Sequence, residues 1–335
     1  NALQESSEFE SQARFYVGVD THTDTHTIAV LDDVGRTLKT ATYPTTAGGY
    51  RSVVKALARF GSPAQVVVGV EGTNSYGAGL TRVLQAGGFT VFEVLRPTRQ
   101  VRRMDGKSDP IDAVEAARTL ISGRGISVPK SSIGAAESLR YLNAARDKYV
   151  SIMTALSNAI LSLLITAPEG IREKYARGTI VNKLQALVGC RPGALDPTSV
   201  DFHVLTTLKS LARTYQETKK AADFLKDQMR LILEKEYPVL LAVHGVGTIT
   251  AAALTITAGD NPQRIHSEAA FAKLCGACPI PASSGKTNRH RLNRGGDRRA
   301  NKALHRIALV RLSTHQPTKD YAQRQTQRGK TKKEI

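Results

Sequence analysis

The chain has no tryptophan, and its 335 residues include only three cysteines and 5% aromatic side chains. So few cysteines, in odd number, exclude a disulfide-stapled scaffold and suit a reducing compartment. Uninterrupted apolar runs fall well short of the roughly 20 residues of a membrane span. The stretch 1–13 is polar and acidic and lacks the apolar region of a signal peptide. We therefore expect a cytoplasmic protein with no membrane partner.

Acidic residues are scarcer than basic ones. The chain holds 29 Asp and Glu against 47 Lys and Arg, a formal net charge of +18. Residues 286–335 alone contain 15 basic and 3 acidic residues, a net charge of +12. A basic stripe of this kind indicates a polyphosphate partner such as nucleic acid. Because aromatic residues are scarce, we expect contacts to phosphate backbones rather than stacking on bases.

The first 125 residues alternate strand and helix patterns. Strands are predicted at 15–20, 27–32, 37–43, 65–70 and 90–95, and helices at 47–60, 76–86 and 110–122. The order is βββαβαβα, in which three antiparallel strands precede parallel crossovers, and it is typical of a ribonuclease-H-like domain. Gly and Pro mark 123–129 as a linker.

The remaining chain has mainly helical patterns. Apolar residues recur at alternating steps of three and four from Leu142 to Leu163 and from Leu208 to Ile232, and the stretch 168–202 between them is irregular. Two readings stay open: an internal antiparallel helix pair, or a helical arm that dimerises. Beyond them we predict helices at 250–258, 269–275 and 298–313, a polar loop at 279–296 and a disordered tail from 314.

The predicted fold class is therefore α/β plus α. We expect a disordered N-terminus at 1–13, an α/β domain at 14–128, a helical coiled-coil region at 129–237, a mainly α domain at 238–315 and a basic tail at 316–335. In the fourth of these, the turn at 243–247 (VHGVG) resembles a helix-hairpin-helix turn, whose backbone N–H groups face a phosphate. A plain tight turn explains it equally well.

Four acids carry the clearest chemical signal. Asp20 ends the first predicted strand and Glu71 the fourth, and these two strands are neighbours in this topology. Asp109 and Asp112 bracket Pro110, which suits the first helical position and makes Asp109 the predicted N-cap. Taken alone, the pattern Asp-Pro-x-Asp is also a capping pattern with no chemical role. Four converging carboxylates repel one another unless a cation neutralises them, and oxygen ligands favour Mg²⁺ or Mn²⁺.

Other polar residues surround these acids in the sequence. His22, Asp24 and His26 could bind a transition metal, although a turn followed by a strand start is the simpler reading. A basic run leads into Asp109 and could steer phosphate or be a solvated face. It consists of Arg96, Arg99, Arg102, Arg103 and Lys107.

A second loop combines hydroxyl groups with cations. Ser283 and Ser284 precede Gly285, and basic residues crowd the next positions. Guanidinium groups could hold a phosphate and stabilise the charge that develops when a serine attacks it. The basic residues predicted to contact nucleic acid are Lys286, Arg289, Arg291, Arg294, Arg298 and Arg299.

The order and spacing of these motifs resemble the DEDD transposases of bacterial insertion sequences, which are described as bridge-RNA-guided recombinases. The resemblance covers nearly the whole chain. Its motifs lie at 16–20 (YVGVD), 70–73 (VEGT), 107–113 (KSDPIDA), 244–247 (HGVG), 274–279 (LCGACP), 283–285 (SSG) and 294–298 (RGGDR).

The resemblance implies a mechanism. Asp20, Glu71, Asp109 and Asp112 would bind Mg²⁺ in a domain like that of the Holliday-junction resolvase RuvC. Ser284, or alternatively Ser283, would be the nucleophile that becomes joined to DNA. The active site would be composite, formed between subunits of a homodimer or homotetramer. A structured guide RNA would pair with donor and target DNA, in the bacterial cytoplasm at the nucleoid.

Three other readings compete with this one. A metal-dependent RuvC-like nuclease or junction resolvase would use the acids without a serine nucleophile. A non-enzymatic nucleic-acid binder would use the acids only as helix caps. A sugar or acetate kinase shares the early strand order, but it needs glycine-rich phosphate loops that the segments 21–24 (THTD) and 72–75 (GTNS) do not supply.

Overall fold

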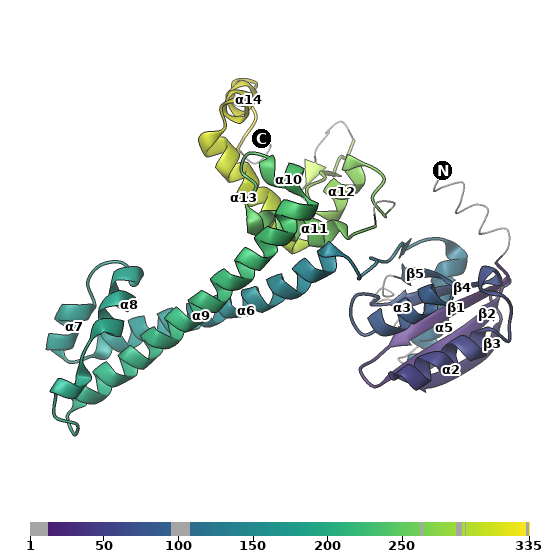
Figure 1. Cartoon of the computed structure of the whole chain (residues 1–335). Helices are drawn as coiled ribbons and strands as arrows, with labels where there is room; N and C mark the ends of the chain where they lie inside the picture. Colours follow the sequence, from purple (N-terminus) through teal and green to yellow (C-terminus); the bar gives the residue numbers. More distant parts are fainter. Residues whose placement is uncertain (1–12, 95–107, 262–263, 286–289, 292, 333–334) are drawn as a thin grey trace. The chain divides into compact units, whose positions relative to one another are not determined.

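The structure, a computed structural model, describes residues 13–94, 108–261, 264–285, 290–291, 293–332 and 335. The chain divides into two compact units (Figure 1). The first comprises 1–134 with 258–270, and the second comprises 135–257 with 271–335. The predicted disordered stretch 1–13 lies almost entirely outside the described residues.

The first unit is built on a six-stranded sheet in the order β3-β2-β1-β4-β5-β6. Its strands are β1 (Phe15–Thr21), β2 (Thr25–Asp32), β3 (Thr37–Pro44), β4 (Val66–Glu71), β5 (Thr90–Val94) and β6 (Ile126–Ser127). The first three are antiparallel, and β4 and β5 run parallel to β1. The predicted strand order is confirmed and is consistent with a ribonuclease-H-like fold. The predicted linker at 123–129 is wrong in part, because it contains β6, which is too short to show a periodic pattern.

Helices cover both faces of this sheet (Figure 1). One face packs against α2 (Ala47–Leu57) and α3 (Ala78–Ala86), and the other packs against α5 (Asp109–Ser122). Side chains alternate between the faces of a strand. Val17 and Val19 of β1 therefore join the core with α2 and α3, whereas Ala29 and Leu31 of β2 contact Ala113 and other residues of α5.

Two long helices dominate the second unit. These are α6 (Ala135–Thr166) and α9 (Val200–Glu236), which lie side by side within the chain (Figure 1). The connecting stretch predicted to be irregular contains α7 (Glu169–Tyr175), α8 (Ile180–Gly189) and the 3-10 helix η2 (Pro192–Ala194). That prediction is wrong because the connection buries its own apolar residues, among them Ile171 and Leu187, against the ends of the long helices.

Of the two predicted apolar seams, the one on α9 is buried or half-buried inside the second unit and the one on α6 is largely exposed. In α9 the seam faces inward, with Leu208, Ala222 and Met229 buried. In α6 the buried positions fall in a different register, at Leu139, Asn143, Ile160 and Leu164, and much of the predicted seam is exposed. One 18-residue window of α6 has a mean hydropathy of 1.7 with 11% of it buried. By length and composition alone α6 could cross a membrane. The sequence contains no uninterrupted apolar run of that length here, because Ser, Thr and Asn interrupt the apolar residues of α6.

A mainly helical layer completes the second unit. It comprises α10 (Pro238–Ala242), α11 (Thr248–Ala258), α12 (Glu268–Leu274), β7 (Ile280–Pro281), β8 (His290–Arg291), α13 (Arg298–Thr314) and α14 (Gln316–Gln327). The first part of α12 clusters with the first unit. The predicted polar loop thus contains the antiparallel pair β7 and β8. The predicted disordered tail contains α14, whose first turn is held by a hydrogen bond of 2.8 Å between His315 Nδ1 and Thr318 Oγ1.

Candidate metal site and basic surfaces

Two of the predicted acids lie at the carboxyl ends of adjacent parallel strands. Asp20 is the penultimate residue of β1 and Glu71 is the last residue of β4. Their exposed fractions are 5% and 2%. The Thr21 hydroxyl donates a hydrogen bond of 2.9 Å to the backbone carbonyl of Glu71. This contact ties the two strand ends together and holds both acids at one edge of the sheet.

The other two acids come from the first turn of α5. The N-cap is Ser108, so the prediction of Asp109 as N-cap is wrong: Asp109 opens the helix and Pro110 follows it. Asp112 is buried, and its N–H donates to the Ser108 carbonyl at 3.0 Å. Negative side chains are favoured in this first turn by the helix dipole. The first turn of α5 therefore brings the carboxylates of Asp109 and Asp112 to the site, and neither residue is the N-cap.

Gly18 explains how α5 can approach β1 so closely. A Cβ atom built on Gly18 would lie 1.9 Å from the Ala113 carbonyl oxygen and 2.4 Å from the Ala117 nitrogen. Both atoms belong to the α5 backbone, which cannot move aside without moving the helix. The absence of a side chain at Gly18 thus sets the position of Asp109 and Asp112 relative to Asp20.

His22 lies between carboxylates of the two elements. Its Nε2 is 3.2 Å from Asp20 Oδ2 and 3.4 Å from Asp109 Oδ1. One ligand atom from each of these three residues lies within 4.8 Å of the others, as a shared metal ion requires. Asp24 is not part of this group. His26 is 1% exposed and stacks on Tyr50 of α2 at a centroid distance of 5.8 Å, so the predicted His22, Asp24 and His26 trio does not form one site.

The electrostatics of Asp20 reflect this crowding. Burial raises the pKa of Asp20 above its ordinary value, and the negative charges of Asp112 and Asp109 raise it further, while His22 opposes them. A divalent cation would reverse this trend by favouring the ionised carboxylates. The oxygen-rich donor set fits a hard divalent cation.

The predicted serine loop lies in the second unit. Ser283 and Ser284 are both exposed and follow β7, and Gly285 has a positive φ of 55°. Within the described part of the chain, and apart from its two neighbours in the sequence, no heavy atom lies within 4 Å of a Cβ built on Gly285. The loop therefore places both serines at the surface.

Only some of the predicted basic residues lie within the described part of the chain. Arg291, Arg294, Arg298 and Arg299 are exposed. Arg294 and Arg298 line a cavity of about 350 Å³ together with Lys302, whereas Arg299 lies 3.7 Å from Asp147 of α6. The others, Arg99, Arg102, Arg103, Lys107, Lys286 and Arg289, lie outside the described residues.

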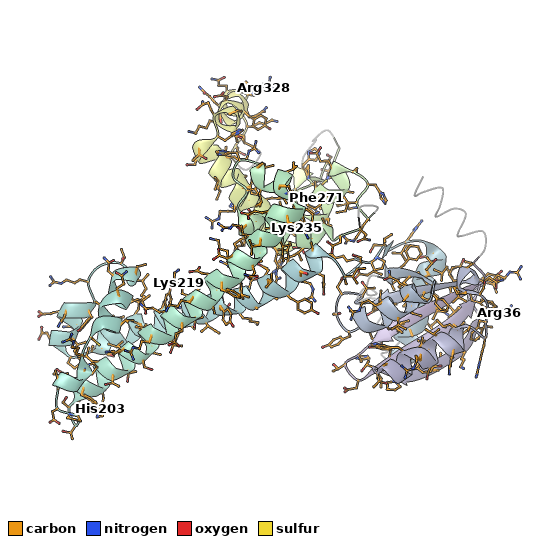
Figure 2. All side chains as sticks on the ribbon, viewed as in Figure 1. Arg36, His203, Lys219, Lys235, Phe271 and Arg328 are labelled. Atoms are coloured by element: carbon orange, nitrogen blue, oxygen red, sulfur yellow. The ribbon has the colours of Figure 1, made fainter. Side chains whose placement is uncertain are left out.

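Further cations surround the turn that resembles a helix-hairpin-helix. Lys226 of α9 and Arg306 of α13 line a cavity of about 420 Å³ beside Gly245 and Gly247. Sequence reasoning identified the turn but missed both cations, which come from helices far away along the chain. Figure 2 shows more basic side chains, among them Lys219 and Lys235 on α9 and Arg328 at the C-cap of α14.

Comparison with known proteins gives two family matches and one curated relative. Residues 17–167 match a model for the DEDD domain of IS110-type elements, described as a transposase, and residues 237–323 match one described as "Transposase IS116/IS110/IS902 family". A Streptomyces coelicolor protein, "Insertion element IS110 uncharacterized 43.6 kDa protein", is 32% identical over 131 residues. That alignment covers 38% of this chain and 31% of the relative's length. All four acids lie inside the first match, and both serines lie inside the second.

Proposed function

Since the chain belongs to the IS110 family of DEDD transposases, we propose that it cuts and rejoins DNA to move an insertion sequence. The observation that carries this proposal is the convergence of Asp20 and Asp109 around His22, with Glu71 and Asp112 buried at neighbouring positions. A cluster that raises the pKa of its own carboxyl group is costly unless a cation binds there. Phosphoryl transfer on DNA is the chemistry that such a cation supports.

Asp20, Glu71, Asp109 and Asp112 are the proposed metal ligands, with Mg²⁺ or Mn²⁺ as the ion. When bound, the ion would neutralise charge on the reacting phosphate. The protein's own part is to fix the ligands. The strand ends β1 and β4 hold two of them, and the close packing of α5 at Gly18 holds the other two.

Ser284 is the proposed nucleophile, with Ser283 as the alternative. Its Oγ would bond to the phosphorus as the bond from phosphorus to the displaced DNA oxygen breaks. The serine proton would pass to a base, and the displaced oxygen would take up a proton from solvent and leave as a hydroxyl. The exposure of both serines and the absence of a side chain at Gly285 would allow a DNA backbone to approach. Among the described residues of this loop, 280–285 and 290–291, the sequence contains no carboxylate to act as the base. The group that activates the serine is therefore proposed to come from the metal site of the first unit, supplied by a second subunit.

A structured guide RNA is the proposed source of sequence specificity. The absence of tryptophan and the net charge of +18 suit a protein that contacts backbones, while base pairing between RNA and DNA selects the sites. RNA that copurifies with the full chain, and that sequencing traces to the same element, is the expected observation.

One experiment tests the metal and the nucleophile together. The full chain with its RNA is incubated with donor and target DNA, and both recombinant DNA and covalent protein–DNA adducts are measured. We expect no recombination after Asp20→Asn or in EDTA, no adduct after Ser284→Ala, and an adduct that persists after Ser283→Ala. Binding of RNA should remain near normal in Asp20→Asn, since metal and duplex contact use different surfaces.

The outcomes separate the competing mechanisms. Recombination in EDTA would contradict the metal site. An adduct that maps to Ser283 would reverse the serine assignment. DNA cleavage that survives both serine substitutions without an adduct would support the RuvC-like nuclease or junction resolvase instead.

A further inference from the structure

We propose that His22 is itself a metal ligand, and that it adds one nitrogen donor to the carboxylate site. This inference rests on the proposed function, because the ion is the one that the four acids would hold. It goes beyond that function by assigning a fifth residue and a preference among metal ions.

The distances match ligands that share one ion. In an octahedral shell with bonds of about 2.1 Å, adjacent ligand atoms lie about 3.0 Å apart and opposite ones about 4.2 Å apart. His22 Nε2 lies 3.2 Å from Asp20 Oδ2 and 3.4 Å from Asp109 Oδ1, and one ligand atom from each of the three residues lies within 4.8 Å of the others. Small movements of these side chains would therefore suffice to enclose an ion.

The backbone places His22 at the mouth of the site. Side chains two residues apart lie on the same side of a strand, so His22 continues the side of β1 that carries Asp20. The His22 N–H donates to the Thr25 carbonyl at 3.0 Å and closes the turn into β2. The His22 side chain is 49% exposed, whereas that of Asp20 is 8% exposed. An accessible imidazole thus lies beside a buried carboxylate.

A purely structural role predicts different behaviour. A histidine that only orients Asp20 needs that one partner, yet His22 also contacts Asp109 from another element. His26 offers no substitute, because it is 1% exposed and packs against Tyr50. An experiment can distinguish a His22 that binds the ion from a His22 that only orients Asp20, because only a ligand has its imidazole nitrogen bonded to the ion.

The proposed ligand has a consequence for metal choice. Imidazole nitrogen suits transition metals, whereas Mg²⁺ favours oxygen ligands. The wild-type site should therefore prefer Mn²⁺ over Mg²⁺ more strongly than a site with oxygen ligands alone. His22→Asp provides that comparison because it keeps a ligand and replaces nitrogen with oxygen.

Pulsed electron paramagnetic resonance of the Mn²⁺-loaded full chain, without an affinity tag, tests the inference directly. We expect modulation from a directly bound ¹⁴N nucleus in wild type and none in His22→Ala or His22→Asp. Mn²⁺ should bind at least about 10-fold more weakly to His22→Ala, because even the loss of a residue that only supports a metal ligand costs about that much. His203→Ala is the matched control, since His203 is an exposed histidine of α9 and should change neither reading (Figure 2).

The contrary results are equally distinct. Mn²⁺ that binds at the acids without ¹⁴N modulation, or with modulation that survives His22→Ala, overturns the role of His22 and leaves the proposed function standing. A wild-type chain that binds no Mn²⁺, and whose recombination survives EDTA, overturns the metal site and His22 ligation together. A preference for Mn²⁺ that is unchanged in His22→Asp also contradicts the inference.

Discussion

At the scale of single residues, Asp20 of the candidate site acts against the stability of the fold. Burial, followed by the charges of Asp112 and Asp109, raises the pKa of Asp20. A group with a raised pKa binds its proton more tightly in the folded than in the unfolded chain. Its stabilising effect is present below the unfolded pKa and is lost as pH rises through the folded pKa. Ionised Asp20 therefore destabilises the metal-free protein at neutral pH.

We predict that Asp20→Asn raises the melting temperature of the metal-free protein at neutral pH. This gain in melting temperature should shrink as pH falls. It should disappear below pH 3.8, the ordinary pKa of an aspartic acid, because the wild-type carboxyl group is then protonated in both the folded and the unfolded chain. Thermal denaturation in EDTA across this range measures the difference. A lower melting temperature for Asp20→Asn at neutral pH would show that the carboxylate stabilises the fold instead.

The acids could be found from sequence, whereas the place of His22 could not. Asp20 and Glu71 each end a β-branched run, and their proximity follows once the strand order is known. The contact between His22 and Asp109 depends on how closely α5 approaches β1, which no periodic pattern encodes. The same applies to Ser108, whose role as N-cap was assigned to its neighbour.

At the scale of elements, two paired glycines of the sheet differ in what α5 presents to them: backbone atoms at one and a side chain at the other. Gly18 of β1 lies in register with Gly69 of β4. A Cβ on Gly18 would meet α5 backbone atoms at 1.9 and 2.4 Å, whereas the atoms nearest to a Cβ on Gly69 belong to the Leu120 side chain, the closest at 2.9 Å. A side chain can change rotamer, but a backbone can yield only if the helix moves.

We therefore predict that Gly18→Ala weakens Mn²⁺ binding by at least about tenfold, because it shifts Asp109 and Asp112 away from Asp20. Overpacking should also cost about 1–3 kcal/mol of unfolding free energy. Gly69→Ala should cost less and should leave Mn²⁺ affinity within a few fold of wild type. Calorimetric titration with Mn²⁺ and denaturant unfolding measure the two effects. Equal affinities in the two variants would contradict this role for Gly18.

The start of α13 is the basic element that the sequence identified most directly. Arg294→Ala and Arg298→Ala should each reduce the slope of log affinity against log salt by about one charge, because each cation releases about one counterion. Filter binding over a salt series measures the slope. Arg36→Ala is the control, since Arg36 pairs with Asp32 at 2.7 Å in the first unit. An unchanged slope in both test variants would mean that these arginines form only a solvated face.

Helix identity was easier to predict than helix environment. The spacing of apolar residues located α6 and α9. It did not predict which face of α6 packs against α9, because α6 carries two overlapping sets of residues at helical spacing and only one of them is buried. Leu139, Asn143, Ile160 and Leu164 supply the buried register, and it contains a polar residue that a hydrophobic pattern omits. The helix α14 escaped prediction for a related reason, because contacts with the end of α13 hold its first turn.

At the scale of the whole molecule, α6 retains an apolar stripe that no described residue of this chain covers. The stripe comprises Ala145, Ile152, Ala159 and Leu163, all exposed, with Ile152 at 44% and Leu163 at 38%. A second copy of the chain or a membrane could cover such a surface. The proposed reaction favours the second copy, because the acids and the serines lie in different units and a composite site would draw them from different chains.

Mixing two inactive variants tests this arrangement. Asp20→Asn keeps the serine and Ser284→Ala keeps the acids, so chains that share a site should complement one another. If each subunit supplies the serine for one site and the acids for another, mixed assemblies hold some intact sites and should recover about a quarter of wild-type recombination by random pairing of two chain types.

Adding Ile152→Glu to both variants should remove the recovery if the stripe joins the copies, while Thr154→Glu, on another exposed face of α6, should not. Recombination assays of the mixtures, with light scattering to give the mass of each species, measure both effects. Binding of the wild-type chain to vesicles in place of self-association would assign the stripe to a membrane, and the absence of recovery from mixtures that do associate would place the acids and the serine of each site in one chain.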